Sequence, residues 1–390
     1  MKKAIIIPVY LRVERPKDLS SSQGMVLTRR ALQSLEVLAE KDFTLILPVC
    51  LSFSENREDF LHQGEEAFHD EIRRCRAERM IVFSSLRLGA LRKWLEPRTP
   101  PGFPSLVGLE GYSKIRNVGL LIAQALATEV AVFIDNDEVV EDPDYLEKAT
   151  EYLGERWNDG WVSGKGGFYL NPDGSILLPS QKKWWSIFWD KTKWMNETYK
   201  RILESKERLV PTPMLLGGNL VLHQRLFEEV PFDPFIPRGE DTDYLINALG
   251  HGFRIPFDRK LRIKHLHPVR TEAYHYQELK GDIERFLYER QKLQEGPTLD
   301  LDPYPGHFLR GTLSLKAFLT AWLLCLDYLG RGQGRKAKET LSMLRLLLQK
   351  RKEVWPAYLR FQKGWKRVMK IVREEGMGSV LEERERENRG

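Results

Sequence analysis

Short apolar runs alternate with amphipathic stretches through the first two thirds of the chain. Four runs are long enough and rich enough in branched residues to form buried strands, at residues 4–7, 43–49, 80–83 and 130–134. Strands that alternate with helical stretches are typical of a largely parallel sheet covered by helices. The pattern therefore predicts an α/β fold with a Rossmann-like sheet of the kind that binds nucleotides.

The last third of the chain has a different pattern, because apolar residues recur at helical spacing from about residue 276 to the end. A chain of 390 residues has room for two structural units. We predict an α/β domain over residues 1–275 and a helical C-terminal subdomain over residues 276–390. The apolar stretch 317–326 is too short to cross a bilayer, which takes about 20 residues, and no signal-peptide pattern opens the chain. We expect a cytoplasmic protein.

Positive charge is concentrated in the helical subdomain. Residues 331–390 contain 17 Lys and Arg against 8 Asp and Glu, so they carry +9, whereas the rest of the chain carries −3. Such helices either pack in a bundle with their charges solvated, the simpler alternative, or lie on the anionic inner face of a membrane. Nucleic-acid binding is not expected, since no zinc-finger, helix-turn-helix or RNP pattern accompanies the charge.

Two carboxylates follow the last predicted strand. Asp135 and Asp137 come directly after the apolar run 130–134. Open α/β sheets bind ligands at the carboxyl ends of their strands, and an unpaired buried carboxylate is costly. Mg²⁺ or Mn²⁺ would compensate both charges and is commonly shared with substrate phosphates. A solvated turn is the alternative for this short pattern taken alone.

Two further segments favour ligand binding. Arg116 and Asn117 lie in the first turn of a helical pattern, where backbone N–H groups and a guanidinium both favour phosphate. Gly217, Gly218 and Asn219 follow later in the chain, and paired glycines permit a close backbone approach to a ligand, although plain turns use them more often.

The next polar residues suggest chemistry, each with a simpler alternative. Glu240 and Asp241 begin a helical pattern, where acids also complement the helix dipole. His265 and His267 share one face of a predicted strand at 261–268, and imidazole joins carboxylates at transition-metal sites. The three cysteines are scattered, so neither a thiolate zinc cluster nor a disulfide framework is expected.

The order of these motifs resembles that of GT-A fold glycosyltransferases of the family 2 type, over about residues 1–275. The resemblance rests on six segments, in order: Ile5-Ile6-Ile7-Pro8-Val9-Tyr10, Arg116-Asn117, Asp135-x-Asp137, Gly217-Gly218-Asn219, Gly239-Glu240-Asp241 and His267. It implies metal-dependent transfer of a sugar from a nucleotide-diphosphate sugar to an acceptor hydroxyl, with inversion favoured over retention.

The resemblance also implies a role for each motif. The implied roles are the nucleotide site for Pro8 and Tyr10, ribose and metal for Asp135 and Asp137, the donor sugar for Gly218 and Asn219, and the catalytic base for Asp241, with Glu240 as the next candidate. Arg116 and Asn117 would complete the donor site, and either His265 or His267 would join the Mn²⁺ or Mg²⁺ ion.

The chain departs from the family pattern after its second predicted strand. Family members commonly carry an acidic Asp-Asp or Asp-Gly-Ser segment there, whereas residues 52–56 read Ser-Phe-Ser-Glu-Asn. Ser52, Ser54 or Glu55 would have to contact the base instead, and uridine and guanosine sugars both stay candidates.

The acceptor side is less specified. Trp184, Trp185 and Trp189 lie in the stretch where the resembling family places its acceptor elements, and aromatic rings offer large contact areas. Core packing is the alternative for these tryptophans. We expect a sugar, a lipid-linked molecule or another small molecule as acceptor, and peripheral membrane contact through the C-terminal helices.

Two other classes fit parts of the pattern. A sugar-phosphate nucleotidylyltransferase shares the sheet and the need for Mg²⁺ but carries a Gly-rich basic loop after the first strand, unlike residues 8–13 here. A non-catalytic sugar- or lipid-binding protein would need neither metal nor base. No Gly-x-Gly-x-x-Gly follows the first strand and no Gly-Lys-Ser/Thr loop occurs, which counts against dinucleotide oxidoreductases and P-loop enzymes.

Overall fold

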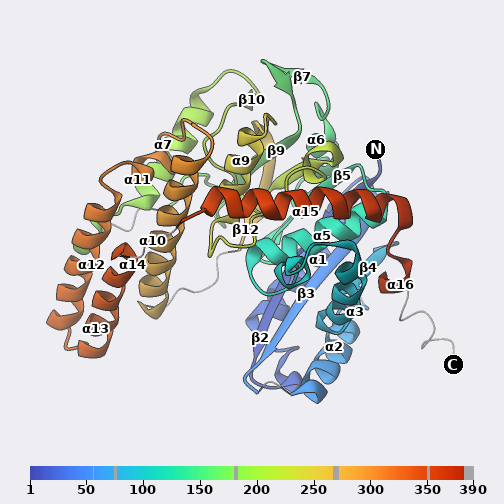
Figure 1. Ribbon diagram of the computed structural model, residues 1–390, viewed down its shortest axis with the longest axis horizontal. Coiled ribbons are helices and arrows are strands. Elements are labelled where there is room, and N and C mark those ends of the chain that lie inside the picture. The colour runs from blue at the N-terminus through green and yellow to red at the C-terminus, as the bar shows by residue number, and fades with distance from the viewer. Residues whose placement is uncertain (56, 74–76, 180–182, 267–271, 349–351, 382–390) are drawn as a thin grey trace.

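A computed structural model describes the whole chain except residues 56, 74–76, 180–182, 267–271, 349–351 and 382–390. A ten-stranded sheet lies at its centre, with helices on both faces (Figure 1). The strand order is β10-β12-β9-β11-β5-β1-β3-β2, with β4 beside β3 and β6 beside β12. Five strand pairs of this sheet are parallel and four are antiparallel, so the predicted α/β class is confirmed.

The strands of the described residues are β1 (Lys3–Ile6), β2 (Val9–Val13), β3 (Thr44–Phe53), β4 (Met80–Phe83), β5 (Val130–Phe133), β6 (Glu138–Val139), β7 (Arg156–Trp157), β8 (Gly160–Trp161), β9 (Gly164–Leu170), β10 (Leu209–Val210), β11 (Leu220–His223) and β12 (Phe257–His265). β7 and β8 form a separate hairpin.

The α-helices are α1 (Gln23–Ser34), α2 (Glu58–Ile72), α3 (Ser85–Leu95), α4 (Phe103–Leu106), α5 (Tyr112–Ala125), α6 (Tyr145–Thr150), α7 (Lys191–Glu204), α8 (Gln224–Phe227), α9 (Glu240–Gly250), α10 (Glu272–Glu295), α11 (Gly306–Leu309), α12 (Leu313–Gly330), α13 (Gly334–Ser342), α14 (Leu344–Leu348), α15 (Val354–Glu375) and α16 (Gly378–Leu381). Short 3₁₀ helices lie at η1 (Pro16–Asp18), η2 (Leu35–Val37), η3 (Glu96–Arg98) and η4 (Trp184–Ser186).

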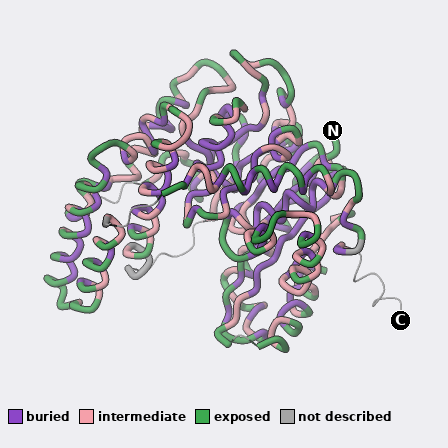
Figure 2. Tube along the Cα trace, in the orientation of Figure 1, coloured by how far each residue is buried: buried purple, intermediate pink, exposed green. Residues whose placement is uncertain are grey.

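The central strands are buried on both faces, which explains their continuous apolar runs. Ile6 and Phe133 belong to one hydrophobic core, whereas Ile5 and Val132, one residue away, belong to the other. Successive residues of a strand point to opposite faces of the sheet, so they enter different cores. Figure 2 shows the central strands buried along their length. The four predicted strands correspond to β1, β3, β4 and β5, but β2 was missed because it begins three residues after β1 ends.

The helical subdomain shares its cores with the sheet. α15 crosses in front of α5 (Figure 1), and Phe361, Trp365 and Met369 of α15 are buried in the core on that face of the sheet. The Trp365 Nε1 atom donates a hydrogen bond to the Phe227 carbonyl at 2.8 Å. A second core joins α10, α12 and α13 to strand β9. The boundary predicted near residue 275 therefore separates kinds of secondary structure and does not separate cores.

A buried ion cluster strengthens this connection. Lys292 of α10 is fully buried, and its Nζ atom lies 2.5 Å from Asp233, 2.6 Å from Asp243 and 3.1 Å from the Asn247 side-chain oxygen. Burial raises the pKa of Asp243 to about 6, although Lys292 opposes this shift. A buried charge is tolerable only with its partners in place, so α10 completes the charge balance of α9.

Replacing Lys292 with methionine should therefore lower the free energy of unfolding by about 3 to 5 kcal/mol, because two buried carboxylates lose their cation. Denaturant unfolding measures this loss. Adding Asp233→Asn and Asp243→Asn to the same chain should recover much of it. Lys370→Met, which removes an exposed cation of α15, is the control and should change stability little. Equal stability of the two single variants would contradict the argument.

Candidate active site

A cavity of about 680 Å³ opens next to the segments that follow β1 and β5; we call it the central cavity. The starts of α5 and α9, the end of β12 and parts of α7 and α10 complete its wall. Eight of the predicted site residues line it: Pro8, Tyr10, Arg116, Asp135, Asp137, Glu240, Asp241 and His265. The sequence motifs, spread over more than 250 positions, thus meet at one place.

Arg116 holds three of these segments together. Its guanidinium lies 2.6 Å from Asp135, 3.1 Å from Glu240 and 3.0 Å from the Gly217 carbonyl. The Arg116 side chain is only 3% exposed. Burial alone would lower the pKa of Arg116, but the Asp135 and Glu240 carboxylates raise it, so the guanidinium stays charged. Arg116 is thus primarily an organiser of the site, and phosphate contact is not needed to explain it.

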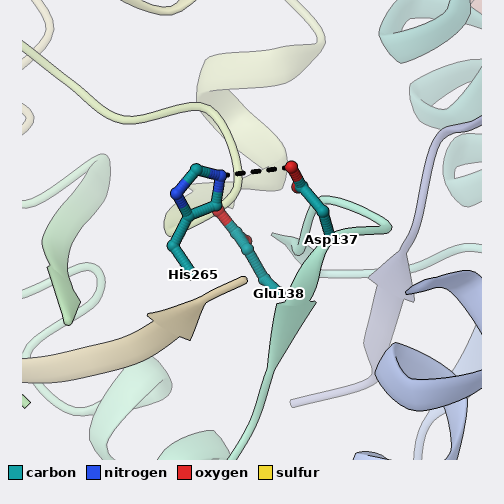
Figure 3. A group of neighbouring side chains, drawn as sticks. All are labelled: Asp137, Glu138 and His265. Atoms are coloured by element: carbon teal, nitrogen blue, oxygen red, sulfur yellow. Dashed lines mark hydrogen bonds and ion pairs between the residues drawn. The ribbon is translucent and has the colours of Figure 1, made fainter. Parts of the chain in front are cut away.

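Asp137, Glu138 and His265 form a second cluster, whose side chains are of the types that bind metal ions (Figure 3). Asp137 and Glu138 come from β6 and the turn before it, and His265 from the paired end of β12; one ligand atom from each lies within 4.8 Å of the others. The His265 Nε2 atom is 3.2 Å from Asp137 Oδ2, and the ring stacks on Tyr169 with centroids 5.1 Å apart.

The donor set fits a divalent cation. Two carboxylates and an imidazole are ligands that Mn²⁺ accepts. Glu138 is fully buried, and its Oε1 atom has no hydrogen-bond partner among the described residues, which is costly unless something charged is bound there. Burial, followed by the Asp135 and Asp137 charges, raises the pKa of Glu138 well above its ordinary value. A cation would relieve both conditions.

This cluster differs from the predicted one in three ways. Asp135 is bound to Arg116 and is not among the converging ligand atoms, so the prediction of Asp135 as a metal ligand is not supported by the geometry. Glu138 replaces it and was missed, although its position opposite His265 follows from strand pairing. His267 lies outside the described residues.

The two acids at the start of α9 have different surroundings. Glu240 is 7% exposed and paired with Arg116, and burial raises its pKa while Arg116 opposes the shift. Asp241 also lines the cavity, but among the described residues no cation lies within ion-pair distance of it. The Asp241 carboxylate is therefore not held by a described cation, whereas the Glu240 carboxylate is paired with Arg116.

The predicted donor-binding amides and glycines have structural roles. Asn117 exchanges two hydrogen bonds with the Phe232 backbone, at 2.8 and 2.9 Å, and Asn219 binds Tyr145 and the Phe168 carbonyl inside the fold. Neither Asn117 nor Asn219 lines the central cavity. We correct both predictions: these amides hold the segments that carry the site.

The paired glycines make room for charged side chains. A Cβ atom on Gly217 would lie 2.5 Å from an Arg116 nitrogen, and one on Gly218 would lie 2.1 Å from a Glu138 oxygen. The prediction was a close approach to a ligand, whereas the groups that approach these glycines in the structure are side chains of the protein itself.

The tryptophans do not line the central cavity. Trp185 and Trp189 are buried in the core of the helical subdomain, where Trp189 packs against Phe286 and Phe308. Trp184 is exposed, and its Nε1 atom donates to Asp327 at 2.7 Å. The packing alternative therefore describes Trp185 and Trp189, and acceptor contact by these three residues is not supported.

Residues without a sequence signal complete the far wall of the cavity. They are Lys191, Arg238, Arg285 and Tyr304. The Arg285 side chain lies against Gly239, which has φ +73 and whose Cβ would come within 2.2 Å of the guanidinium. No local motif identifies Lys191, Arg285 or Tyr304, because α7, α10 and the segment after α10 reach the site only through tertiary packing.

A second cavity of about 450 Å³, which we call the edge cavity, lies beside the end of β3. Ser52 and Glu55 line it, as do Arg57 and Lys114, whereas Ser54 does not. Tyr10 lines both cavities. The N-terminus of α5 lies between them, since Glu110 faces one and Gly111 the other.

Comparisons with known proteins give structural likenesses only. No protein-family model and no curated protein sequence matches the chain. A mannosyltransferase from Pyrobaculum calidifontis, solved with GDP-Man and Mn²⁺, is 13% identical with a TM-score of 0.48, over 96% of this chain and 87% of that one.

Two further structures are less similar. Glucosyl-3-phosphoglycerate synthase from Mycobacterium tuberculosis, solved with Mg²⁺ and UDP, is 14% identical with a TM-score of 0.33, over 73% of this chain and 79% of that one. Mouse xyloside xylosyltransferase 1 is 14% identical with a TM-score of 0.31, over 65% of this chain and 85% of that one. By their names, these three structures are sugar-transferring enzymes.

Because Arg116 compensates two carboxylates, Arg116→Met should cost about 3 to 5 kcal/mol of folding free energy. Arg116→Lys keeps the charge but cannot reach three acceptors at once, so its loss should be smaller. Thermal and denaturant unfolding of both variants show which of them loses more stability. A methionine variant as stable as the original protein would show that Arg116 does not organise the site.

Proposed function

We propose that this protein is a glycosyltransferase that moves a sugar from a nucleotide-diphosphate sugar to an acceptor hydroxyl, with a divalent cation. One observation supports it above the others: a carboxylate and imidazole cluster, a helix N-terminus and an unpaired carboxylate meet in one cavity. A donor diphosphate needs the first two, and an acceptor hydroxyl needs the third.

The two cavities suggest how the donor lies. The edge cavity offers Ser52, Glu55 and Arg57 as hydrogen-bonding groups for a nucleobase, in place of the acidic segment that the chain lacks. The N-terminus of α5 separates the cavities and suits the diphosphate, because its first N–H groups lack helical partners. The sugar would then lie in the central cavity, between Asp137 and Asp241.

Asp137, Glu138 and His265 would hold the cation, Mn²⁺ or Mg²⁺, and its chemistry there is to neutralise the negative charge of the leaving diphosphate. Tyr169 fixes the imidazole plane by stacking. Arg116 keeps Asp135 and Glu240 in place and adds one positive charge to a strongly acidic wall.

Asp241 is the proposed general base. Its carboxylate would take the proton of the acceptor hydroxyl while that oxygen attacks the anomeric carbon and the diphosphate leaves, which inverts the configuration. Lys191, Arg285 and Tyr304 would contact the acceptor, because they line the same cavity as Asp241.

A sugar-phosphate nucleotidylyltransferase is the second candidate, because that class shares the α/β sheet and the need for Mg²⁺. The segment after β1 leads within three residues into β2, and offers no glycine-rich phosphate loop. The cytoplasmic location and membrane contact stay predictions.

The direct test is a screen of GDP- and UDP-sugars for hydrolysis, with and without Mn²⁺. We expect slow release of the nucleoside diphosphate from one donor class, since water can replace the acceptor. Release of inorganic diphosphate from a sugar phosphate and a nucleoside triphosphate would instead identify a nucleotidylyltransferase.

Asp137→Ala should abolish donor hydrolysis and the Mn²⁺-dependent part of nucleotide binding, because the cluster loses a carboxylate ligand. Calorimetric titration with nucleoside diphosphate and Mn²⁺ measures the second effect. Asp144→Ala removes a nearby exposed acid outside both cavities and should change neither. Turnover that survives both Asp137→Ala and added EDTA would exclude metal dependence.

Asp241→Asn should separate catalysis from binding. Stability should change by about 1 kcal/mol or less, since Asn retains the size and most of the hydrogen bonding. Transfer to an acceptor should fall by about 10² to 10⁴, the usual worth of a general base, while calorimetric nucleotide affinity stays the same. Near-normal transfer by this variant would remove Asp241 as the base and favour a retaining mechanism.

A further inference from the structure

The outer face of α12 is apolar along its whole length. Leu315, Phe318, Trp322, Leu326 and Leu329 recur at spacings of three and four residues and are 42 to 58% exposed. We call these five side chains the α12 face. Figure 2 shows exposed residues recurring along this helix, at the outer edge of the molecule. An ordinary surface helix carries charged or polar residues on that side.

The inner face of α12 is already used for packing. Leu313, Ala317, Ala321, Leu324 and Tyr328 belong to the core of the helical subdomain. Among the described residues α12 alone is long and apolar enough to cross a membrane, but 44% of it is buried inside the protein. A helix fixed to a protein core along one side cannot be surrounded by lipid, so the α12 face can only contact a surface from outside.

The exposed apolar residues are concentrated there. Of the nineteen large hydrophobic side chains exposed in the described part of the chain, five form the α12 face, and three more, Trp184, Ile187 and Phe188, lie in or next to η4. Trp184 is tied to α12 through its hydrogen bond to Asp327. Contiguous apolar surface of this kind marks an interaction site.

Charge identifies the partner. Residues 306–348 contain seven Lys and Arg (Arg310, Lys316, Arg331, Arg335, Lys336, Lys338 and Arg345) against two acids, Asp327 and Glu339. Asp327 is nearly buried and bound by Trp184 and Arg331, so it offers little negative charge to the surface. A second copy of this chain would bring the same excess of cations to the interface and be repelled, whereas an anionic bilayer would be attracted.

We propose that the α12 face is a peripheral docking surface for an anionic lipid bilayer. The five apolar side chains enter the boundary between headgroups and acyl chains, with Trp322 at the depth where tryptophan is favoured. The flanking cations stay at the headgroup phosphates. The contact lies on α12 and its flanks, and the basic outer side of α15 is not required.

Vesicle co-sedimentation of the full chain tests this. Vesicles of phosphatidylcholine and phosphatidylglycerol in equal parts should bind the protein, and vesicles of phosphatidylcholine alone should bind it far less. Phe318→Gln/Trp322→Gln should weaken binding to the anionic vesicles roughly tenfold or more, because two large aromatic side chains leave the interface. Val26→Gln/Val37→Gln removes exposed apolar side chains elsewhere and should bind like the original protein.

Folding is checked by circular dichroism and thermal unfolding of both variants. Should Phe318→Gln/Trp322→Gln unfold, Leu315→Gln/Leu329→Gln at the ends of the face gives the same test at more exposed positions. Equal vesicle binding by a folded variant and the original protein overturns the proposal. Absence of vesicle binding by the original protein also overturns it, as does a solution dimer that the variant dissociates while vesicles bind neither. These outcomes leave the sugar-transfer assays unaffected, so the two proposals fail or stand separately.

Discussion

One buried guanidinium joins segments of the site that are distant from one another in the sequence. Arg116 contacts Asp135 after β5, the Gly217 carbonyl before β11 and Glu240 at the start of α9. A charge removed from water is stable only when all its partners are present, so these segments must come together as a set. The same contacts help to place Asp137 and Asp241, which lie within two residues of Asp135 and Glu240 in the sequence.

Acids that are close together in the sequence therefore have different roles in the site. Asp135 and Glu240 form ion pairs with Arg116. The nearby acids Asp137 and Asp241 also line the cavity and are not paired with Arg116. The glycines follow the same logic, since Gly217, Gly218 and Gly239 omit a side chain where Arg116, Glu138 and Arg285 pass. A motif that looks like a ligand-binding signature is here partly a packing requirement of the ions that build the site.

The sequence predicts the strands that are buried on both faces of the sheet well. It predicts poorly the contacts between residues that are far apart in the chain. Apolar runs located β1, β3, β4 and β5, and the acids at 135–137 and 240–241 located the cavity, because strand ends and helix starts are local features. The assignment of Asn117 and Asn219 to the donor failed, since an amide that binds backbone within the fold has the same local pattern as one that binds a ligand. Arg285 and Tyr304 had no local sequence signal, because only the packing of α10 and of the segment after it brings them to the site.

Because of the Lys292 cluster, the sheet and the C-terminal helices cannot be gained or lost independently during evolution. Asp233 and Asp243 belong to the sheet domain, whereas Lys292, which neutralises them, belongs to α10. Loss of the helices would therefore leave two buried carboxylates without a cation. A shorter relative with this sheet would need neutral residues at both positions, and a relative that keeps both acids would need a cation from some other segment. Those two positions thus indicate, in a sequence alone, whether the helices belong to the same folding unit.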